Sequence, residues 1–249
     1  MKLIWTYDSN SKSLTEEERI ILVNYYILSI TSAKKLGYHT IMVCNESENK
    51  FWKKYVVETC ICDSYENSPL WDSFKMRGLE LLSYNDYLID GDVILHNKIP
   101  ENRNDIIFDS YEILNWSNEY QPTINKLTEL GIGNVIRIWD TKRIPIMNCG
   151  VLSINNIMLR LMYLTQWKKF NQFVIDNINE IDTKYATAVG AQYLLTLIAN
   201  SYNSFSTKLT ENLGDRGEYY QHYYGSQKYT SPIVPTDHIL SPNESIKLF

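Results

Sequence analysis

The chain has no apolar stretch long enough to cross a membrane. Its richest apolar run, Ile20–Ile30, is interrupted by Asn24 and carries tyrosines. The first residues, Met1–Trp5, lead directly into a strand-like pattern and lack the layout of a secretory signal peptide. We therefore expect no membrane span and a protein that works in the cytoplasm.

Cysteine is scarce, and the four residues present are Cys44, Cys60, Cys62 and Cys149. The single residue between Cys60 and Cys62 is too short a spacing for a usual zinc knuckle, and no second close pair would complete one. All four lie in or beside apolar segments that resemble strands. We expect them to be small buried thiols.

The 24 Lys and Arg residues are outnumbered by 29 Asp and Glu residues, which gives a formal net charge of −5. A protein that binds nucleic acid by general electrostatic attraction usually carries a basic excess. The balance argues against such a binder but leaves a local basic groove open. Internal repeats and low-complexity linkers are also missing, so we expect one domain spanning residues 1–249.

The first half of the chain alternates strand and helix patterns. A capping box at Thr15–Glu18 opens a helix that stops at Gly37. Further helices are predicted at 51–55 and 70–83, and strands at 2–7, 39–44 and 56–62. This alternation predicts an α/β fold with a mixed, mostly parallel sheet flanked by helices. Ligands bind such sheets at the carboxyl ends of the strands, where the sequence has Asp8, Asn45 and Asp90.

The second half is less regular. Strands are predicted at 105–109 and 146–154, and helices at 122–130, 157–177 and 184–200. The polar segment from Ser201 onward contains Tyr, Gly, Ser and three prolines. We expect this tail to wrap the surface of the domain.

The most informative stretch is Tyr87–Leu95, in which Asp90 and Asp92 stand between two apolar runs. Short continuous apolar runs predict buried strands, and residues i and i+2 of an extended chain point to the same side. The carboxylates can therefore converge, with Gly91 letting the backbone bend or approach a ligand. Their repulsion favours a hard divalent cation, which usually also holds phosphates. The alternative is a surface turn, because Asp-Gly is a common hairpin dipeptide.

A second stretch, His222–Lys228, carries groups that fit such a site. Histidine can complete a metal site begun by two carboxylates. Gly225 would let backbone N–H groups approach phosphate oxygens, and Lys228 would add a mobile positive charge. Taken alone, the stretch is better explained by an aromatic tail with incidental polar residues.

A third stretch, Asn148–Asn155, places a polar residue and a glycine before an apolar run and an asparagine after it. Asn148 and the backbone of Gly150 could face a sugar. The alternative is an ordinary core strand with polar ends.

Together and in this order, the DGD, the NCGVLSIN segment and the H-x-x-G-x-x-K tail resemble the motifs of glycosyltransferase family 8. The resemblance implies a GT-A fold, which is a Rossmann-type mixed sheet, with a nucleotide-binding half at 1–96 and an acceptor half at 97–249. It implies a hexosyl- or pentosyltransferase that uses a nucleotide diphosphate sugar with Mn²⁺ or Mg²⁺ and retains the anomeric configuration. The Trp71-x-x-x-Lys75 segment also resembles a small bacterial group of GT-A-like proteins.

The resemblance also implies roles for individual residues. The metal ligands would be Asp90, Asp92 and His222. Residues in contact with the nucleotide would be Thr6, Tyr7 and Asp8. Lys75 would reach the diphosphate or the sugar, and Gly225 and Lys228 would close over the diphosphate. The sugar pocket would be lined by Asn148, Gly150 and Gln192. The catalytic set would comprise Asp90, Asp92, Gln192 and Lys228. Outside this resemblance, Lys75 is typical of a solvated helix lysine, Tyr7 of a core aromatic residue and Gln192 of an exposed helix position.

The chain departs from the family pattern at two places. Tyr229 follows Lys228 where the family usually has proline. In Gly190-Ala191-Gln192, the glutamine can be carried over, but the acidic residue that often precedes it cannot. These departures affect the expected donor preference and sugar pocket.

The acceptor is not specified by these motifs. A bacterial surface glycan is one hypothesis. The composition, rich in Asn, Ile, Lys and Tyr, resembles that of large-phage proteins, so hydroxymethylated cytosine in phage DNA is the other. A basic stripe beside the metal site would favour DNA. In either case we expect the protein in the cytoplasm of a bacterium or a phage-infected cell.

Two other classes of function remain open. A haloacid-dehalogenase-type phosphatase also uses an aspartate pair after a strand, but its pair comes early and is followed by a glycine-aspartate loop, for which Gly214–Gly217 is a poor substitute. An inactive transferase fold could also serve as a binding module. The intact Asp90, Asp92, His222 and Lys228 argue against that hypothesis.

Overall fold

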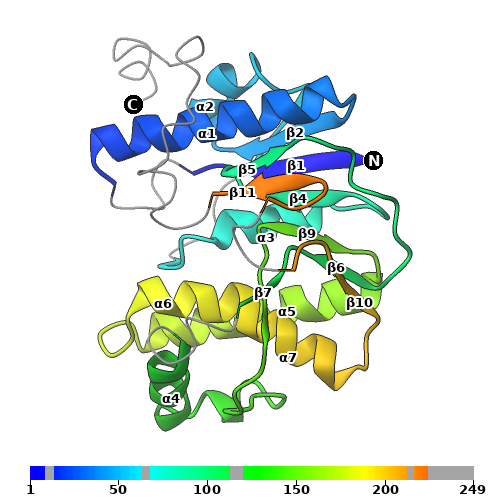
Figure 1. Ribbon diagram of the computed structural model, residues 1–249. Coiled ribbons are helices and arrows are strands. Elements are labelled where there is room, and N and C mark those ends of the chain that lie inside the picture. Colours follow the sequence, from blue (N-terminus) through cyan, green and yellow to red (C-terminus); the bar gives the residue numbers. More distant parts are fainter. Residues whose placement is uncertain (9–13, 63–67, 113–119, 212–215, 224–249) are drawn as a thin grey trace.

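A seven-stranded sheet lies at the centre of the computed structural model, which describes residues 1–8, 14–62, 68–112, 120–211 and 216–223 (Figure 1). The strand order is β10-β6-β9-β4-β1-β2-β3. The strands are β1 (Lys2–Thr6), β2 (His39–Cys44), β3 (Glu58–Ile61), β4 (Tyr87–Ile89), β6 (Ile106–Phe108), β9 (Val151–Ile154) and β10 (Ser206–Lys208). Among these seven, β9 runs antiparallel to both neighbours and the other pairs are parallel. The predicted mixed, mostly parallel sheet is confirmed.

Helices cover both faces of this sheet (Figure 1). One face carries α1 (Glu16–Lys35), α2 (Glu46–Trp52) and a two-stranded ribbon of β5 (Val93–Leu95) and β11 (Tyr220–His222). The other face carries α3 (Ser73–Glu80), α4 (Gln121–Glu129), α5 (Ile157–Asp176), α6 (Thr183–Ala188) and α7 (Leu194–Ser201). A π-helical turn at Val189–Tyr193 joins α6 to α7, a 3-10 turn at Ile132–Asn134 follows α4, and β7 (Tyr111–Glu112) pairs with β8 (Ile146–Met147).

The core is divided by the sheet into two apolar layers. Along β1, Leu3 and Trp5 pack into the layer that contains α1, whereas Ile4 packs into the layer that contains α3 and α5. All three side chains are fully buried. A strand that is covered on both faces needs a continuous apolar run rather than an alternating one, and Leu3-Ile4-Trp5 provides it.

Local signals explain where the first helix begins and ends. The Thr15 side chain accepts a hydrogen bond from the Glu18 backbone N–H, and the Glu18 carboxylate accepts one from the Thr15 backbone N–H. This reciprocal pair confirms the predicted capping box. The helix ends before Gly37, whose φ of 80° is a left-handed conformation that glycine adopts without strain.

The structure corrects several predicted elements. The short helix expected at 51–55 lies earlier, at Glu46–Trp52. The strand expected at 146–154 is split into β8 and β9, because the Asn148 side chain accepts a hydrogen bond from the Gly150 N–H (2.8 Å) and turns the chain there. The tail contributes two strands, β10 and β11, instead of only wrapping the surface.

The outcome for the remaining predictions is mixed. Cys44 and Cys149 are buried thiols as expected, but Cys60 and Cys62 are half-buried because β3 is the edge strand of the sheet. Of the helices in the described ranges, none is long and apolar enough to span a membrane. Strands from both predicted halves share one sheet, and the division at residue 96 stays a prediction.

Candidate functional site

The candidate site lies at the edge of the sheet where the parallel strands end. Asp90 follows β4 and Asp109 follows β6, while Asn148–Gly150 precede the antiparallel β9, which lies between those two strands. The Asp90 backbone N–H donates to the Gly150 carbonyl (2.8 Å). The sheet order alone therefore brings residues from three strands to one place.

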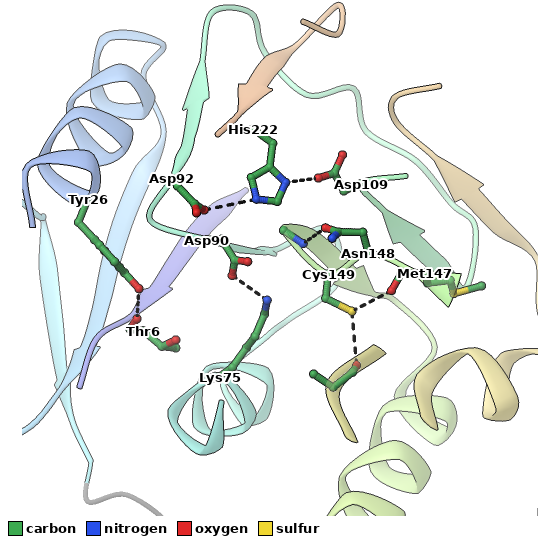
Figure 2. A network of polar contacts seen from close by, with 12 residues as sticks. Thr6, Tyr26, Lys75, Asp90, Asp92, Asp109, Met147, Asn148, Cys149 and His222 are labelled. Atoms are coloured by element: carbon green, nitrogen blue, oxygen red, sulfur yellow. Dashed lines mark hydrogen bonds and ion pairs between the residues drawn. The ribbon is translucent and has the colours of Figure 1, made fainter. Parts of the chain in front are cut away.

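The structure brings Asp90, Asp92 and His222 together, although some 130 positions separate them in the sequence. Each offers one ligand atom, and these atoms all lie within 4.8 Å of one another. The antiparallel pairing of β11 with β5 places His222 opposite Val93, and the Tyr223 N–H donates to the Asp92 carbonyl (2.9 Å). The His222 Nε2 atom is 3.3 Å from the Asp92 Oδ1 atom (Figure 2).

The imidazole of His222 is held by a carboxylate that sequence reasoning missed. The His222 Nδ1 atom lies 2.5 Å from the Asp109 Oδ2 atom. Asp109 is 1% exposed and also accepts hydrogen bonds from the Tyr220 hydroxyl (2.8 Å) and the Thr210 hydroxyl (3.0 Å). A carboxylate on one imidazole nitrogen fixes the ring and makes the other nitrogen a better ligand. Asp109 follows an apolar strand at the same sheet edge as Asp90, and that position was the available signal.

Burial lowers the pKa of His222, but the hydrogen bond and the negative charge of Asp109, assisted by those of Asp92, raise it to about 10. The metal-free site therefore holds a protonated imidazole between two carboxylates at neutral pH. A cation that binds there must displace this proton.

Two glycines allow this close arrangement. A Cβ atom on Gly150 would lie 2.3 Å from the His222 Cε1 atom, so only glycine leaves room for the imidazole. A Cβ atom on Gly91 would lie 2.1 Å from the ring of Tyr26. The Tyr26 hydroxyl donates to the Thr6 carbonyl (2.9 Å). The close neighbour at Gly91 is thus an aromatic ring of α1, whereas we had predicted a ligand or a bend there.

Lys75 of α3 lies at the acidic pair. Its Nζ atom is 2.7 Å from the Asp90 Oδ1 atom, and its side chain is 11% exposed (Figure 2). Burial lowers the pKa of Lys75, but the charge of Asp90, the hydrogen bond to it and the other negative neighbours together outweigh this effect, and the pKa is raised overall. Lys75 is therefore a buried counter-ion of Asp90, and not the solvated helix lysine of the alternative interpretation.

A cavity adjoins this ion pair. Four of the predicted nucleotide or phosphate contacts line it together with Asp90, namely Thr6, Tyr7, Asp8 and Lys75. The rest of its described wall is formed by Leu14, Arg19, Leu22, Tyr26, Trp71, Asp72 and Phe74. Burial raises the pKa of Asp72 to about 7, partly offset by the charge of Lys75.

The predicted sugar contacts Asn148 and Gln192 lie near a second acid, Glu112, which the sequence did not single out. Asn148 Nδ2 donates to Glu112 Oε1 (2.5 Å), and the Tyr120 hydroxyl lies 2.6 Å from Glu112 Oε2 and 2.7 Å from Gln192 Oε1. Gly150, the third predicted sugar contact, abuts His222, and its contact with a sugar stays a prediction. The remaining site predictions, Gly225 and Lys228, fall outside the described residues, as do Gly214 and Asp215 of the weak phosphatase loop.

The donor set suits a hard or borderline divalent cation. Two carboxylate oxygens and one imidazole nitrogen are ligands that Mn²⁺ accepts, and carboxylates also suit Mg²⁺. Asp92 is 8% exposed and His222 is 4% exposed, so the cation would be held at the base of the site rather than on the open surface.

Comparison with known proteins adds little to this description. No protein-family model matches the sequence, and no curated protein matches it either. Among solved structures, the chain is similar to the galactosyltransferase LgtC in complex with donor and acceptor sugar analogues, at a TM-score of 0.43 and 11% identity, covering 84% of this chain and 73% of that one. At that TM-score and identity, the similarity does not bear on function.

Proposed function

We propose that the protein is a metal-dependent glycosyltransferase that moves a sugar from a nucleotide diphosphate sugar to a hydroxyl acceptor. The observation that carries this proposal is the convergence of Asp90, Asp92 and His222 beside a cavity that begins at Thr6–Asp8. The DGD, NCGV and H-x-x-G-x-x-K motifs resemble those of glycosyltransferase family 8. This resemblance is the reason for assigning the arrangement to sugar transfer from a nucleotide diphosphate sugar.

The order of strands supports this assignment of parts. Along this edge of the sheet, Thr6 ends β1 and Tyr7 and Asp8 follow it, Asp90 follows the neighbouring β4, and Asn148 precedes β9, the next strand. Adjacent strands lie about 4.8 Å apart. A nucleoside at β1, a diphosphate at β4 and a sugar at β9 would therefore each occupy roughly one strand spacing, which suits the length of a nucleotide diphosphate sugar.

The residues of the site have separate tasks in this reaction. The bond between the sugar C1 atom and the phosphate oxygen breaks, and negative charge grows on the leaving diphosphate. A bound Mn²⁺ or Mg²⁺ would supply positive charge at that position. Lys75 places a second, buried positive charge beside Asp90, and Lys228 would add a third. Asp109 holds the His222 ring so that its Nε2 atom faces Asp92. Retention of anomeric configuration rests on the family resemblance.

The charges beside the acidic pair bear on the choice of acceptor. Among the described residues that line the cavity, the basic ones are Arg19 and Lys75 and the acidic ones are Asp8, Asp72 and Asp90. These residues do not form the basic stripe that a DNA backbone would need. A glycan hydroxyl is therefore our first candidate for the acceptor, and hydroxymethylated cytosine is the second.

A thermal-shift panel tests the proposal. Uridine and guanosine diphosphate sugars are added with and without Mn²⁺, and release of nucleoside diphosphate is then measured with any stabilising donor. We expect stabilisation that requires the metal, since ligand binding raises stability by mass action. Asp90→Asn and Asp92→Asn should each lower turnover roughly a hundredfold or more, the usual effect of removing a transition-state stabiliser.

Three results would contradict the proposal. Near-normal turnover in either variant would show that the acidic pair does not take part in the reaction. No response to any donor, with or without metal, would point to a binding module, and hydrolysis of p-nitrophenyl phosphate would point to a phosphatase.

A further inference from the structure

A polar cluster that the metal site does not use lies next to it. It consists of Glu112 of β7, Tyr120 at the start of α4, Asn148 before β9 and Gln192 in the π-helical turn, and we call it the Glu112 cluster. Asn148 donates to one oxygen of Glu112 (2.5 Å), and Tyr120 donates to the other (2.6 Å). With its NH₂ group facing the acid, Gln192 lies 3.3 Å from both oxygens and 2.7 Å from the Tyr120 hydroxyl.

This cluster has the construction of a binding site. Three side chains from separate elements, those of Tyr120, Asn148 and Gln192, converge on the one carboxylate of Glu112. Gln192 is delivered by a π-helical turn, a rare irregularity that is frequent at functional sites. Glu112 and Gln192 are half-buried, so the acid is partly open to solvent.

The cluster is linked directly to the acidic pair. The Asn148 side chain accepts a hydrogen bond from the Gly150 N–H (2.8 Å), and the Gly150 carbonyl accepts one from the Asp90 N–H (2.8 Å). Cys149, which lies between them, is within electrostatic range of Lys75, Asp90 and Glu112. In Figure 2, Asn148 lies on the opposite side of Asp90 from Thr6 and Tyr26. A group attached to a diphosphate at Asp90, and pointing away from the nucleoside, would therefore meet this cluster.

We infer that Glu112, which is held by two of the residues predicted to line the sugar pocket, selects neutral sugars over sugar acids. This inference rests on the proposed function. A carboxylate accepts hydrogen bonds from sugar hydroxyls, and the amides of Asn148 and Gln192 hold it in place. The same charge repels a uronate carboxylate that approaches the cluster. Neutral sugars are therefore favoured both by hydrogen bonds to Glu112 and by the repulsion of their acidic counterparts. Glu112 is thus a specificity-determining residue.

The test compares Glu112→Gln with the wild-type protein by titration calorimetry in Mn²⁺. Matched donor pairs are UDP-glucose with UDP-glucuronate and GDP-mannose with GDP-mannuronate, and UDP and GDP serve as probes without a sugar. We expect the wild type to bind the neutral donor at least tenfold more tightly than its uronate. Glu112→Gln should keep the affinity for UDP or GDP within about twofold and lose most of that preference. Glu129→Gln, an exposed acid on α4, should change nothing.

The outcomes separate this inference from the proposed function. An unchanged preference in Glu112→Gln, with normal binding of UDP or GDP, overturns the inference alone. Absence of metal-dependent binding of either diphosphate to the wild type overturns the proposed function, and the inference with it. If Glu112→Gln does not fold, Glu112→Ala removes the same charge with a smaller side chain, and an unaltered preference in that variant counts equally against the inference.

Discussion

Replacing Gly150 with alanine should displace His222 from the site. The added Cβ atom would lie 2.3 Å from the His222 Cε1 atom and 2.6 Å from its Nδ1 atom, whereas ordinary van der Waals contact begins near 3.4 Å. The imidazole would have to retreat by about 1.1 Å to reach that contact. The same Cβ atom would lie 3.0 Å from the Asp109 Oδ2 atom. Both the His222 ring and the Asp109 carboxylate would therefore have to move away from it.

The cost has two parts. Overfilling a packed interior costs about 1–3 kcal/mol, and weakening the hydrogen bond between His222 and Asp109 adds about 1.5–3 kcal/mol, the usual value for a bond to a charged group. We therefore expect Gly150→Ala to lower the free energy of unfolding by roughly 2.5–6 kcal/mol. A metal ligand that has moved by about 1 Å no longer coordinates, so the affinity for Mn²⁺ should fall about tenfold to a hundredfold, as for other damaged metal sites.

Urea denaturation measures the first effect, and calorimetric titration with Mn²⁺ measures the second. Gly133→Ala is the matched control, because a Cβ atom there would meet nothing within 4 Å. Gly133→Ala should leave the affinity for Mn²⁺ unchanged. It should raise the free energy of unfolding by about 0.4–1 kcal/mol, because alanine lowers the conformational entropy of the unfolded chain. Wild-type metal affinity in Gly150→Ala would refute the reasoning, since the imidazole would then not lie where the structure places it.

Three further predictions concern the charged groups of the site. Asp109→Asn should weaken Mn²⁺ binding about tenfold to a hundredfold by calorimetry, with a modest loss of melting temperature, because the His222 ring loses its carboxylate partner; a wild-type affinity would contradict this role. The pKa of His222 is raised to about 10, so protonation stabilises the metal-free protein fully below about pH 6.5, and this contribution is lost as the pH rises through about 10. Mn²⁺ affinity should therefore increase from pH 6.5 to pH 9 and show no such increase in His222→Gln. Burial raises the pKa of Asp72 to about 7, so stability should fall as the pH rises from about 4 to 7, and Asp72→Asn should stabilise the protein at pH 8 by roughly 2–4 kcal/mol in urea denaturation; an unchanged free energy would show that the acid is not buried as described.

The parts of the fold that could be predicted are those with local signals. The strand at 39–44 and the capping box at Thr15 depend on neighbours in the chain, and both lie where the sequence predicts. The convergence of Asp90 with Asp92 could be expected from the alternation of an extended chain. In contrast, the helix at Glu46–Trp52 was placed too late, because the polar residues of its first turn hide its start.

The parts that could not be predicted depend on pairing between distant segments. The carboxylate that holds His222 belongs to Asp109, more than 100 residues earlier, and their contact exists because β11 pairs with β5 above the ends of β4 and β6. Glu112 meets Gln192 only because β7, β8 and the π-helical turn pack together. A position after an apolar strand was the one signal that could have suggested Asp109, and Glu112 had none.

The pairing of β11 with β5 also has a consequence for the order of events during synthesis. Asp90 and Asp92 leave the ribosome long before His222 does, and β5 must wait for its partner strand. A growing or truncated chain that stops before Tyr220 would have acidic groups without their imidazole and an apolar layer without the buried Tyr220 ring. Assembly of the candidate cation site is therefore a late step, and immature chains would lack it.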